Sequence, residues 1–385
     1  MIVQCHINAS ADRSHDSKHK WIGRLSDGAA CIVPLKWVDI RALVLSCLIV
    51  SSGCAGGKNI PSWVTTGVFH WEGGPSVLSI DPSKLPPASS SNPWGSVRDP
   101  SMVYYKSRWH LFASILKIKG GESGRVRIGY MSFTDWSQAK AQDWHLIELY
   151  NPGDYIDYHG APQIFFFTPQ NRWYLVYQLV DKARGITYGP CYSTSNDISD
   201  PKSWTLPTRL WPDQAGVPPG LDHWVICDDL KCHHFYSTLD GNIWRAETLI
   251  ADFPAKWTKP VVAVTGNIFE ATHTYKIAGI NKYITVADTH GNATVGERIQ
   301  TAYLADRLDG PWTPLADTNA KSFASLANTT FPAGKWTNTI DHGELIRAGY
   351  DQKLEIDPND LRWVYQGKTD KPYVHDFQLG MLVFK

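Results

Sequence analysis

The sequence repeats one short strand pattern five times, and this repetition constrains the fold more than any other feature. In each copy, a lysine or arginine begins a segment in which large apolar and aromatic side chains alternate with smaller ones, as in a half-buried strand. The five segments are residues 108–114, 172–178, 231–237, 282–288 and 362–366. Five similar strands predict five similar structural units.

A second pattern follows four of these strands and marks the end of each unit. It consists of an aspartate a few residues ahead of a tryptophan, at Trp136, Trp204, Trp257 and Trp312. Repeats of this length, made of short strands and turns, are typical of propeller blades, and no long stretch has helical apolar spacing. The sequence therefore predicts an all-β fold, a five-bladed β-propeller. A two-sheet sandwich is the alternative, but it does not explain five parallel copies.

The last unit lacks one edge, and the first strand of the chain could supply it. Residues 343–347, 362–366 and 377–384 read as the strands of this unit, while residues 68–71 form a short strand far upstream. Pairing of the two would close the ring and leave no exposed sheet edge.

The first 57 residues do not have the composition of a folded domain. A basic flank at 36–41 precedes an apolar run at 42–50 and small residues up to Cys54, as in a secretory signal. The run is too short for an ordinary transmembrane helix. We expect residues 1–57 to be an export or lipoprotein-like leader and 58–385 to be the propeller. The protein would then be secreted, periplasmic or a cell-surface lipoprotein, touching a membrane only through a lipid on Cys54.

Charge and aromatic content limit the classes of partner. Lys plus Arg and Asp plus Glu both number 37, which provides no field for binding nucleic acid or another polyanion. The 17 Trp and 17 Tyr suit carbohydrate faces as well as cores. We expect a monomer that binds a polysaccharide.

Three cysteines lie beyond Cys54. Cys227 and Cys232 flank a tight turn, so a local disulfide could form in an oxidising compartment. With His233 and His234 they could instead suggest zinc, but alternating strand positions point side chains to different faces. The sequence does not identify a partner for Cys191.

Three acids precede strands of the repeat. Asp99 lies nine residues before Arg108, Asp222 nine before Lys231, and Glu270 twelve before Lys282, where the turn is longer. A single Asp before Pro is usually a turn or cap residue. In a propeller, however, the first strand of each blade lines the axis, so equivalent positions converge at one mouth. Three converging carboxylates suit glycoside hydrolysis by inversion, in which one acid activates water and another protonates the leaving oxygen.

Seven motifs occur in a fixed order along the chain. They are VRDPS (97–101), IGYMSFTDWS (128–137), APQIFFFTPQNRWYLVYQ (161–178), LDHWVICDD (221–229), FEA (269–271), LDGPWT (308–313) and WTNTIDHGEL (336–345). Together they resemble glycoside hydrolase family 62, which comprises inverting α-L-arabinofuranosidases with a five-bladed propeller that act on arabinoxylan. The sister family 43 shares the propeller and the Arg-Asp-Pro motif.

The resemblance implies roles for individual residues. Asp99 would be the general base, Glu270 the general acid and Asp222 the residue that tunes the acid and positions the sugar. His342 resembles a histidine that helps to hold calcium at the axis of such propellers; no organic cofactor is implied. Arg98, beside the base, is expected to bind substrate. Gln178, Tyr365 and Gln366 lie at strand ends and could bind sugar hydroxyls, although core or turn roles are equally compatible.

The chain departs from the family pattern in one region. It has Val286-Ala-Asp288 where the family usually has Val-Glu-Ala, and the loop 289–296 is also unusual. Because these changes fall near the cleft, the polymer is less well specified than the sugar. The leading hypothesis is removal of arabinofuranosyl groups from arabinoxylan or arabinan. The alternatives are a propeller glycosidase for another pentoside (a β-xylosidase or endo-arabinanase) and a non-catalytic carbohydrate-binding propeller.

Overall fold

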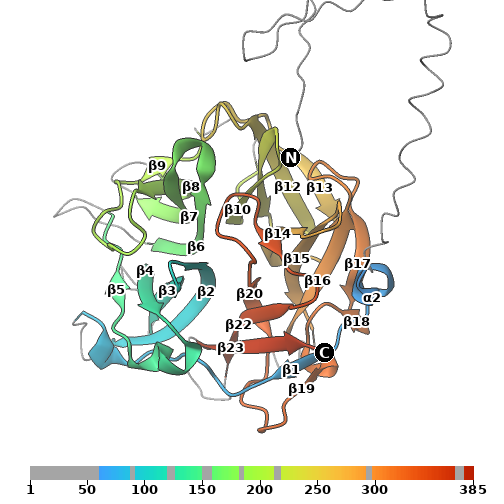
Figure 1. Ribbon diagram of the computed structural model, residues 1–385, viewed down its shortest axis with the longest axis horizontal. Helices are drawn as coiled ribbons and strands as arrows, with labels where there is room; N and C mark the ends of the chain where they lie inside the picture. Colours follow the sequence, from blue (N-terminus) through green and yellow to red (C-terminus); the bar gives the residue numbers. More distant parts are fainter. Residues whose placement is uncertain are drawn as a thin grey trace, which may run out of the picture. The chain divides into compact units, whose positions relative to one another are not determined.

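In the computed structural model, most paired strands follow one another in the chain, with exceptions such as β1 (Trp71–Gly73) with β23 (Phe377–Phe384) and β14 (Glu270–Ile277) with β21 (Glu355–Ile356) (Figure 1). The structure describes residues 60–86, 92–118, 126–149, 158–181, 186–211, 218–291, 297–368 and 377–385. The predicted leader at 1–57, including Cys54, lies outside these residues, as does most of the loop 289–296.

The pairing gives five antiparallel meanders, which we call units 1 to 5 in chain order. Units 1 and 2 form one sheet, because β4 and β6 share a single parallel pair between Val126 and Tyr158. Each of the other three units is a separate sheet. The residues that the structure describes therefore do not form a two-sheet sandwich. The all-β prediction is confirmed.

The strands of units 1 to 3 are as follows. Unit 1 contains β2 (Trp94–Tyr105), β3 (Arg108–Lys117), β4 (Val126–Phe133) and β5 (His145–Leu146). Unit 2 contains β6 (Tyr158–Phe167), β7 (Arg172–Asp181), β8 (Ile186–Ser195) and β9 (Thr208–Arg209). Unit 3 contains β10 (Leu221–Cys227), β11 (Lys231–Ser237), β12 (Asn242–Leu249) and β13 (Val261–Thr265).

Units 4 and 5 complete the set. Unit 4 contains β14 (Glu270–Ile277), β15 (Tyr283–His290), β16 (Arg298–Ala305), β17 (Thr313–Thr318) and β18 (Lys321–Ser322), with β21 (Glu355–Ile356) added to β14. Unit 5 contains β20 (Asp341–Leu345), β22 (Arg362–Lys368), β23 (Phe377–Phe384), β1 (Trp71–Gly73) and β19 (Thr329–Thr330). The helices are short: α2 (Ser62–Thr66), η1 (Pro82–Lys84), η2 (Trp136–Ala141), η3 (Thr168–Gln170) and η5 (Leu326–Asn328).

The repeated strand pattern marks the second strand of every unit. These strands are β3, β7, β11, β15 and β22, and each pairs with the first strand of its own unit. The predicted closing pair is also present, since Trp71 of β1 lies opposite Phe384 of β23. The start and the end of the described chain therefore meet in one sheet.

The repeated tryptophans are structural. Each packs against a phenylalanine, with ring centroids 4.9 to 5.9 Å apart. The pairs are Trp136 with Phe133, Trp204 with Phe112, Trp257 with Phe253 and Trp312 with Phe235. Two of these contacts cross from one unit to its neighbour. The tryptophans therefore help to hold adjacent units together.

Side-chain hydrogen bonds also join first strands that share no sheet pairing. The amide of Gln163 on β6 donates to the Val225 carbonyl and accepts from the Val225 N–H of β10, both at 2.7 Å. Ser101 on β2 accepts from the N–H of Ile164 on β6 at 3.1 Å. These contacts fix the first strands relative to one another, and with them the residues that the strands carry.

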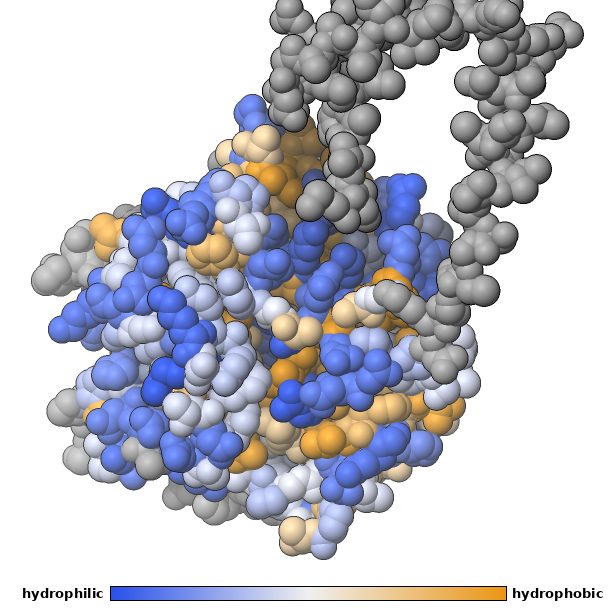
Figure 2. Space-filling model, viewed as in Figure 1, coloured by the Kyte–Doolittle hydropathy of each residue, from blue (hydrophilic) through white to orange (hydrophobic). Residues whose placement is uncertain are grey.

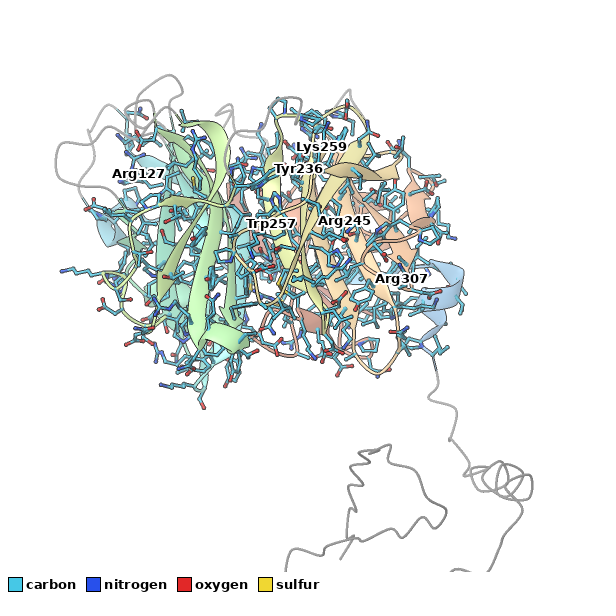
Figure 3. All side chains as sticks on the ribbon, turned by 90° about the horizontal axis from the view of Figure 1, so that it is seen from above. Arg127, Tyr236, Arg245, Trp257, Lys259 and Arg307 are labelled. Carbon is cyan, nitrogen blue, oxygen red and sulfur yellow. A yellow bond between two sulfur atoms is a disulfide. The ribbon has the colours of Figure 1, made fainter. Side chains whose placement is uncertain are left out.

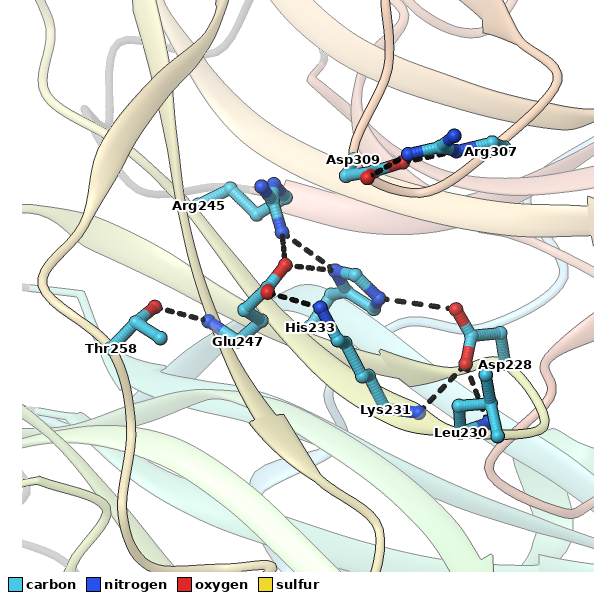
Figure 4. Close-up of polar contacts among 9 residues, drawn as sticks. All are labelled: Asp228, Leu230, Lys231, His233, Arg245, Glu247, Thr258, Arg307 and Asp309. Atoms are coloured by element: carbon cyan, nitrogen blue, oxygen red, sulfur yellow. Dashed lines mark hydrogen bonds and ion pairs between the residues drawn. The ribbon is translucent and has the colours of Figure 1, made fainter.

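The β10–β11 hairpin is closed by a disulfide between Cys227 and Cys232. The sulfurs are bonded to each other, so the zinc alternative for this motif is wrong. Beside the disulfide, His233 lies 3.3 Å from an Asp228 carboxylate oxygen and 2.9 Å from the Arg245 guanidinium (Figure 4). Lys231 donates to Glu247 at 2.5 Å in the same network. In Figure 3, Arg245 and Trp257 lie with the yellow strands of unit 3, and Arg127 of unit 1 lies at the left of the view.

The visible face in Figure 2 is largely polar, with apolar residues gathered over the strands of unit 5. Among the described residues, no helix combines the length and the apolar character needed to cross a membrane.

Candidate active site

A β-bulge interrupts the first strand of every unit, and the candidate acids lie at these bulges. The register against the second strand shifts between Arg98 and Ser101, Gly160 and Gln163, Leu221 and Trp224, Glu270 and His273, and Asp341 and Gly343. In units 1 to 4 the bulged residue has a positive φ, which is unusual for residues other than glycine. These residues are Asp99 (φ 50°), Ala161 (49°), Asp222 (56°) and Ala271 (60°).

The bulges correct one detail of the sequence prediction. Asp99 and Asp222 are themselves bulged residues and are equivalent, as predicted. Glu270 instead comes one residue before the bulged Ala271, and it pairs across the sheet with Asp288 as Arg98 pairs with Ser114. Counting back from the second strand missed this offset because the β14–β15 turn differs in length from the others. The longer glutamate side chain therefore extends from a different backbone position.

Asp222 is buried and is hydrogen-bonded to two neighbouring units. Its side chain is 6% exposed, and its Oδ2 accepts a hydrogen bond of 2.7 Å from the N–H of Ala271. Its own N–H donates to Oε1 of Gln178 at 3.0 Å. Burial raises its pKa well above the ordinary value, and the nearby charges of Glu270 and Asp99 add to this shift. The structure therefore brings the three predicted acids within electrostatic reach of one another.

Glu270 retains partial access to solvent, with a side chain 21% exposed. Burial raises its pKa, and Asp341 and Asp99 act in the same direction. Arg298 opposes them, because its Nη2 lies 3.6 Å from Glu270 Oε1. The net shift favours the protonated form, which is the form that a general acid requires.

Asp99 lies between two basic side chains. Its Oδ1 is 3.9 Å from Nε of Arg98 and 3.3 Å from Nδ1 of His342. Burial would lower the pKa of Arg98, but the charges of Asp99 and Asp341 raise it, so the guanidinium stays charged. The ring of Phe377 lies 4.9 Å from the Arg98 guanidinium carbon. Arg98 thus lies beside the predicted base, and its role in substrate binding stays a prediction.

Three further charged residues complete the site, and the sequence prediction did not assign them roles. Arg298 contacts Asp288 at 3.5 Å as well as Glu270. Asp288 is hydrogen-bonded to Asp341, and their pKa values move apart. Burial and the charge of Asp341 raise the pKa of Asp288. The hydrogen bond from Asp288, together with Arg98, lowers that of Asp341 despite its burial. These shifts favour the neutral form of Asp288 and the charged form of Asp341.

A sequence signal existed for only part of this set. Asp341 stands in the Asp-His-Gly motif. Asp288 is the last residue of the repeated segment 282–288, at the position that Ser114 occupies in the segment 108–114. Arg298 follows an unusual loop, and no spacing rule connects it to Glu270.

His342 is placed next to the predicted base. Its Nε2 lies 3.0 Å from Nε2 of His273, in addition to the contact of Nδ1 with Asp99. Calcium takes six to eight oxygen ligands. Within the described part of the chain, no group of three or more His, Cys, Asp or Glu side chains is arranged to hold a metal. Calcium binding near His342 therefore stays a prediction.

The other three predicted substrate residues are buried. Gln178 is 2% exposed and Gln366 is 0% exposed, and Oε1 of Gln366 accepts a hydrogen bond of 2.9 Å from the N–H of Asp99. Tyr365 is also 0% exposed and packs in the main apolar core, with its ring centroid 5.9 Å from that of Trp336. The two glutamines therefore contact the backbone of the candidate acids, whereas Tyr365 faces the core.

Comparison with known proteins gives a consistent result. The family model described as glycosyl hydrolase family 62 matches residues 83–380. α-L-Arabinofuranosidase C of Cellvibrio japonicus (strain Ueda107) is 35% identical over 311 residues, which cover 78% of this chain and 46% of that protein. The chain thus spans about half the length of this curated relative.

Two solved structures have similar folds. The catalytic domain of a GH62 α-L-arabinofuranosidase from Coprinopsis cinerea is 33% identical, with a TM-score of 0.71 over 83% of this chain and 98% of that one. A GH62 hydrolase in complex with xylotriose is 28% identical, with a TM-score of 0.71 over 84% of this chain and 99% of that one.

Proposed function

Because the chain belongs to glycosyl hydrolase family 62, we propose that it is an α-L-arabinofuranosidase that removes arabinofuranosyl side groups with inversion. The observation that carries this proposal is the clustering of Asp99, Asp222 and Glu270 at bulges of three first strands, where the charges of Glu270 and Asp99 both raise the pKa of Asp222. Placing acidic groups together is electrostatically unfavourable and is typical of functional sites.

The proposed reaction uses two of the acids directly. Asp99, as a carboxylate, takes a proton from water while the water oxygen attacks the anomeric carbon. Glu270 gives its proton to the glycosidic oxygen as the bond from the anomeric carbon to that oxygen breaks. The products are β-arabinofuranose and a polymer with a free hydroxyl. Charge is conserved because one carboxyl gains the proton that the other loses.

Asp222 would support the acid. Its hydrogen bond from the Ala271 N–H fixes the backbone next to Glu270. Burial and the charges of Asp341 and Asp99 raise the pKa of Glu270 and help to keep it protonated. The Asp288–Asp341 pair and Arg298 surround the same carboxyl from β15, β20 and β16.

We also infer that the five meanders are the blades of one closed propeller. The support comes from the equivalent bulges in all five first strands and from the pairing of β1 with β23. In such a ring the bulges would face a common centre, as the proposed site requires.

Arabinoxylan is the substrate that we favour. A relative of similar length was solved with xylotriose, a fragment of the backbone of such a polymer. Arabinan, another pentoside, or binding without catalysis remain alternatives, because the acids alone do not select the polymer.

Proton NMR of a reaction with arabinoxylan tests the proposal in a single experiment. We expect β-arabinofuranose to appear before mutarotation. Release of the α-anomer would contradict inversion, release of xylose or arabinan fragments would favour the other glycosidases, and binding without any release would favour a binding platform.

Three further proposals concern the protein around the site. We propose export, with a lipid on Cys54 as one form of the leader, and a monomeric state. Mass spectrometry of the mature N-terminus and light scattering test them. For calcium, dialysis against a chelator should lower the unfolding midpoint if an ion is bound, and an unchanged midpoint would remove the prediction.

A further inference from the structure

We propose that Gln178 and Gln366 are positioning residues that hold the bulged backbone of Asp222 and Asp99 in their catalytic geometry, rather than ligands of the sugar. This inference rests on the proposed function, because it assumes that Asp99 and Asp222 act in glycoside hydrolysis.

The hydrogen bonds of Gln178 and Gln366 have the same geometry and connect equivalent positions in different units. In each, a side chain on the second strand of one unit accepts a hydrogen bond from the bulged N–H of the next unit. Gln366 on β22 accepts from Asp99 on β2 at 2.9 Å, and Gln178 on β7 accepts from Asp222 on β10 at 3.0 Å. The ring order of the units thus determines which glutamine serves which acid.

A bulge makes such a partner necessary. The bulged residue leaves the hydrogen-bond ladder of its sheet, so its N–H needs another acceptor. Leaving a buried N–H without an acceptor is unfavourable, and the left-handed conformation of Asp99 and Asp222 adds strain. The amide oxygens of the glutamines meet this need.

A neutral acceptor suits this location better than a charged one. Asp99, Asp222 and Glu270 already place three carboxyl groups together, and a further carboxylate in its charged form would shift their pKa values. The orientation of each amide is also determined, since only Oε1 can accept from a backbone N–H. Nε2 of Gln178 donates to the Tyr158 hydroxyl at 3.1 Å, so both the oxygen and the nitrogen of its amide are hydrogen-bonded to protein groups.

The Gln178 contact extends to the acid. Gln178 holds Asp222, and Asp222 Oδ2 accepts from the N–H of Ala271, the neighbour of Glu270. One series of hydrogen bonds therefore runs from β7 through β10 to β14. A shift of Asp222 would be transmitted to the segment that carries Glu270.

Unit 2 provides a control for this inference, because its bulge has the same kind of hydrogen bond but carries no acid. In unit 2 the bulged residue is Ala161, which has no acid, and its N–H donates to Oγ of Ser114 at 2.8 Å. Ser114 on β3 is thus the counterpart of the two glutamines at a bulge without an acid. Its removal should cost stability without affecting a catalytic carboxylate.

The test compares kcat and KM for arabinoxylan in Gln178→Met, Gln366→Met and Ser114→Ala variants of the full chain. We expect kcat of the two glutamine variants to fall about 10- to 100-fold with KM nearly unchanged, because small displacements of catalytic groups are costly. Ser114→Ala should lower the unfolding midpoint and leave kcat near that of the wild type.

Glutamate variants guard against loss of folding and test the mechanism. Gln178→Glu and Gln366→Glu retain an acceptor oxygen at the same chain length, and burial favours their neutral form. They should recover most of the kcat that the methionine variants lose.

Two results would overturn the inference while the wild type is active. One is a rise in KM with kcat preserved, which identifies sugar ligands; the other is an equal loss of kcat in Ser114→Ala. Failure of the wild type to release arabinose would instead refute the proposed function.

Discussion

Oδ2 of Asp222 accepts a hydrogen bond of 2.7 Å from the backbone N–H of Ala271, although their strands, β10 and β14, are not paired with each other. The contact crosses from unit 3 to unit 4 and ends beside Glu270. The geometry of the candidate site therefore depends on contacts between units as much as on the strands within them.

Removing either proposed proton-transfer group should abolish most activity. For Asp99→Asn and Glu270→Gln we expect kcat to fall by about 10²- to 10⁴-fold, the usual contribution of general acid–base catalysis. Arabinose release from arabinoxylan is the measurement, with circular dichroism as the check on folding. Folded variants that keep full activity would exclude these roles.

The alkaline side of the rate profile should report Glu270. Its raised pKa keeps it protonated above the ordinary carboxyl range, so kcat/KM should fall only as the pH rises through that raised value. Arg298 lowers the pKa of Glu270, so Arg298→Met should raise it and move the alkaline limb to higher pH. A limb that moves to lower pH would contradict this assignment.

The buried pair of Glu344 and Arg347 should make stability depend on pH. Nε of Arg347 lies 2.7 Å from Glu344 Oε1, and both side chains are fully buried. Burial raises the pKa of Glu344 to about 7 despite the arginine. A carboxyl whose pKa is raised on folding contributes most stability below its unfolded value of 4.5 and loses it as the pH passes about 7.

Arg347→Met should therefore cost more stability at pH 8 than at pH 5. At pH 8 an unpaired buried carboxylate would remain, with a cost of about 3–5 kcal/mol, whereas at pH 5 the carboxyl is neutral. Urea unfolding at both pH values measures the difference. Arg362→Met is the matched control, because its pair with Asp360 is solvent-exposed and should contribute only about 0–1 kcal/mol. Equal losses at both pH values would contradict the role of Glu344.

The Cys227–Cys232 disulfide should affect stability and not catalysis. It closes a short hairpin, for which chain entropy predicts about 2 kcal/mol of stabilisation. It also lies at the opposite end of β10 from Asp222. The Cys227→Ala/Cys232→Ala variant should unfold at lower urea concentration with unchanged kcat, and a reductant should have no further effect on it. A loss of kcat would show that the hairpin supports the site.

The fold was largely predictable because its signal is repeated. A single segment such as residues 172–178 predicts only a strand, but five copies predict five second strands, and the structure contains all five. The local bridge between Cys227 and Cys232 was also within reach, because turn spacing is a short-range property.

The site was predictable only where a local pattern carried the information. Asp99 and Asp222 keep the same distance from their second strands, so their equivalence was visible. The position of Glu270 one residue before the bulge depends on the bulge itself, which no sequence pattern marks. Arg298 meets Glu270 only because β16 lies beyond β15 in the folded sheet, so spacing along the chain does not reveal the contact.

The pairing of Trp71 with Phe384 has a consequence for synthesis in the cell. At about 5–20 residues per second, a ribosome would produce β23 some tens of seconds after β1. Until β19 and then β23 have been made, β1 lacks its partner strands, and the side chain of Trp71 has no unit 5 to pack against. The last unit can therefore assemble only after β23 has been synthesised, although its strand β1 is among the earliest parts of the described chain to be made.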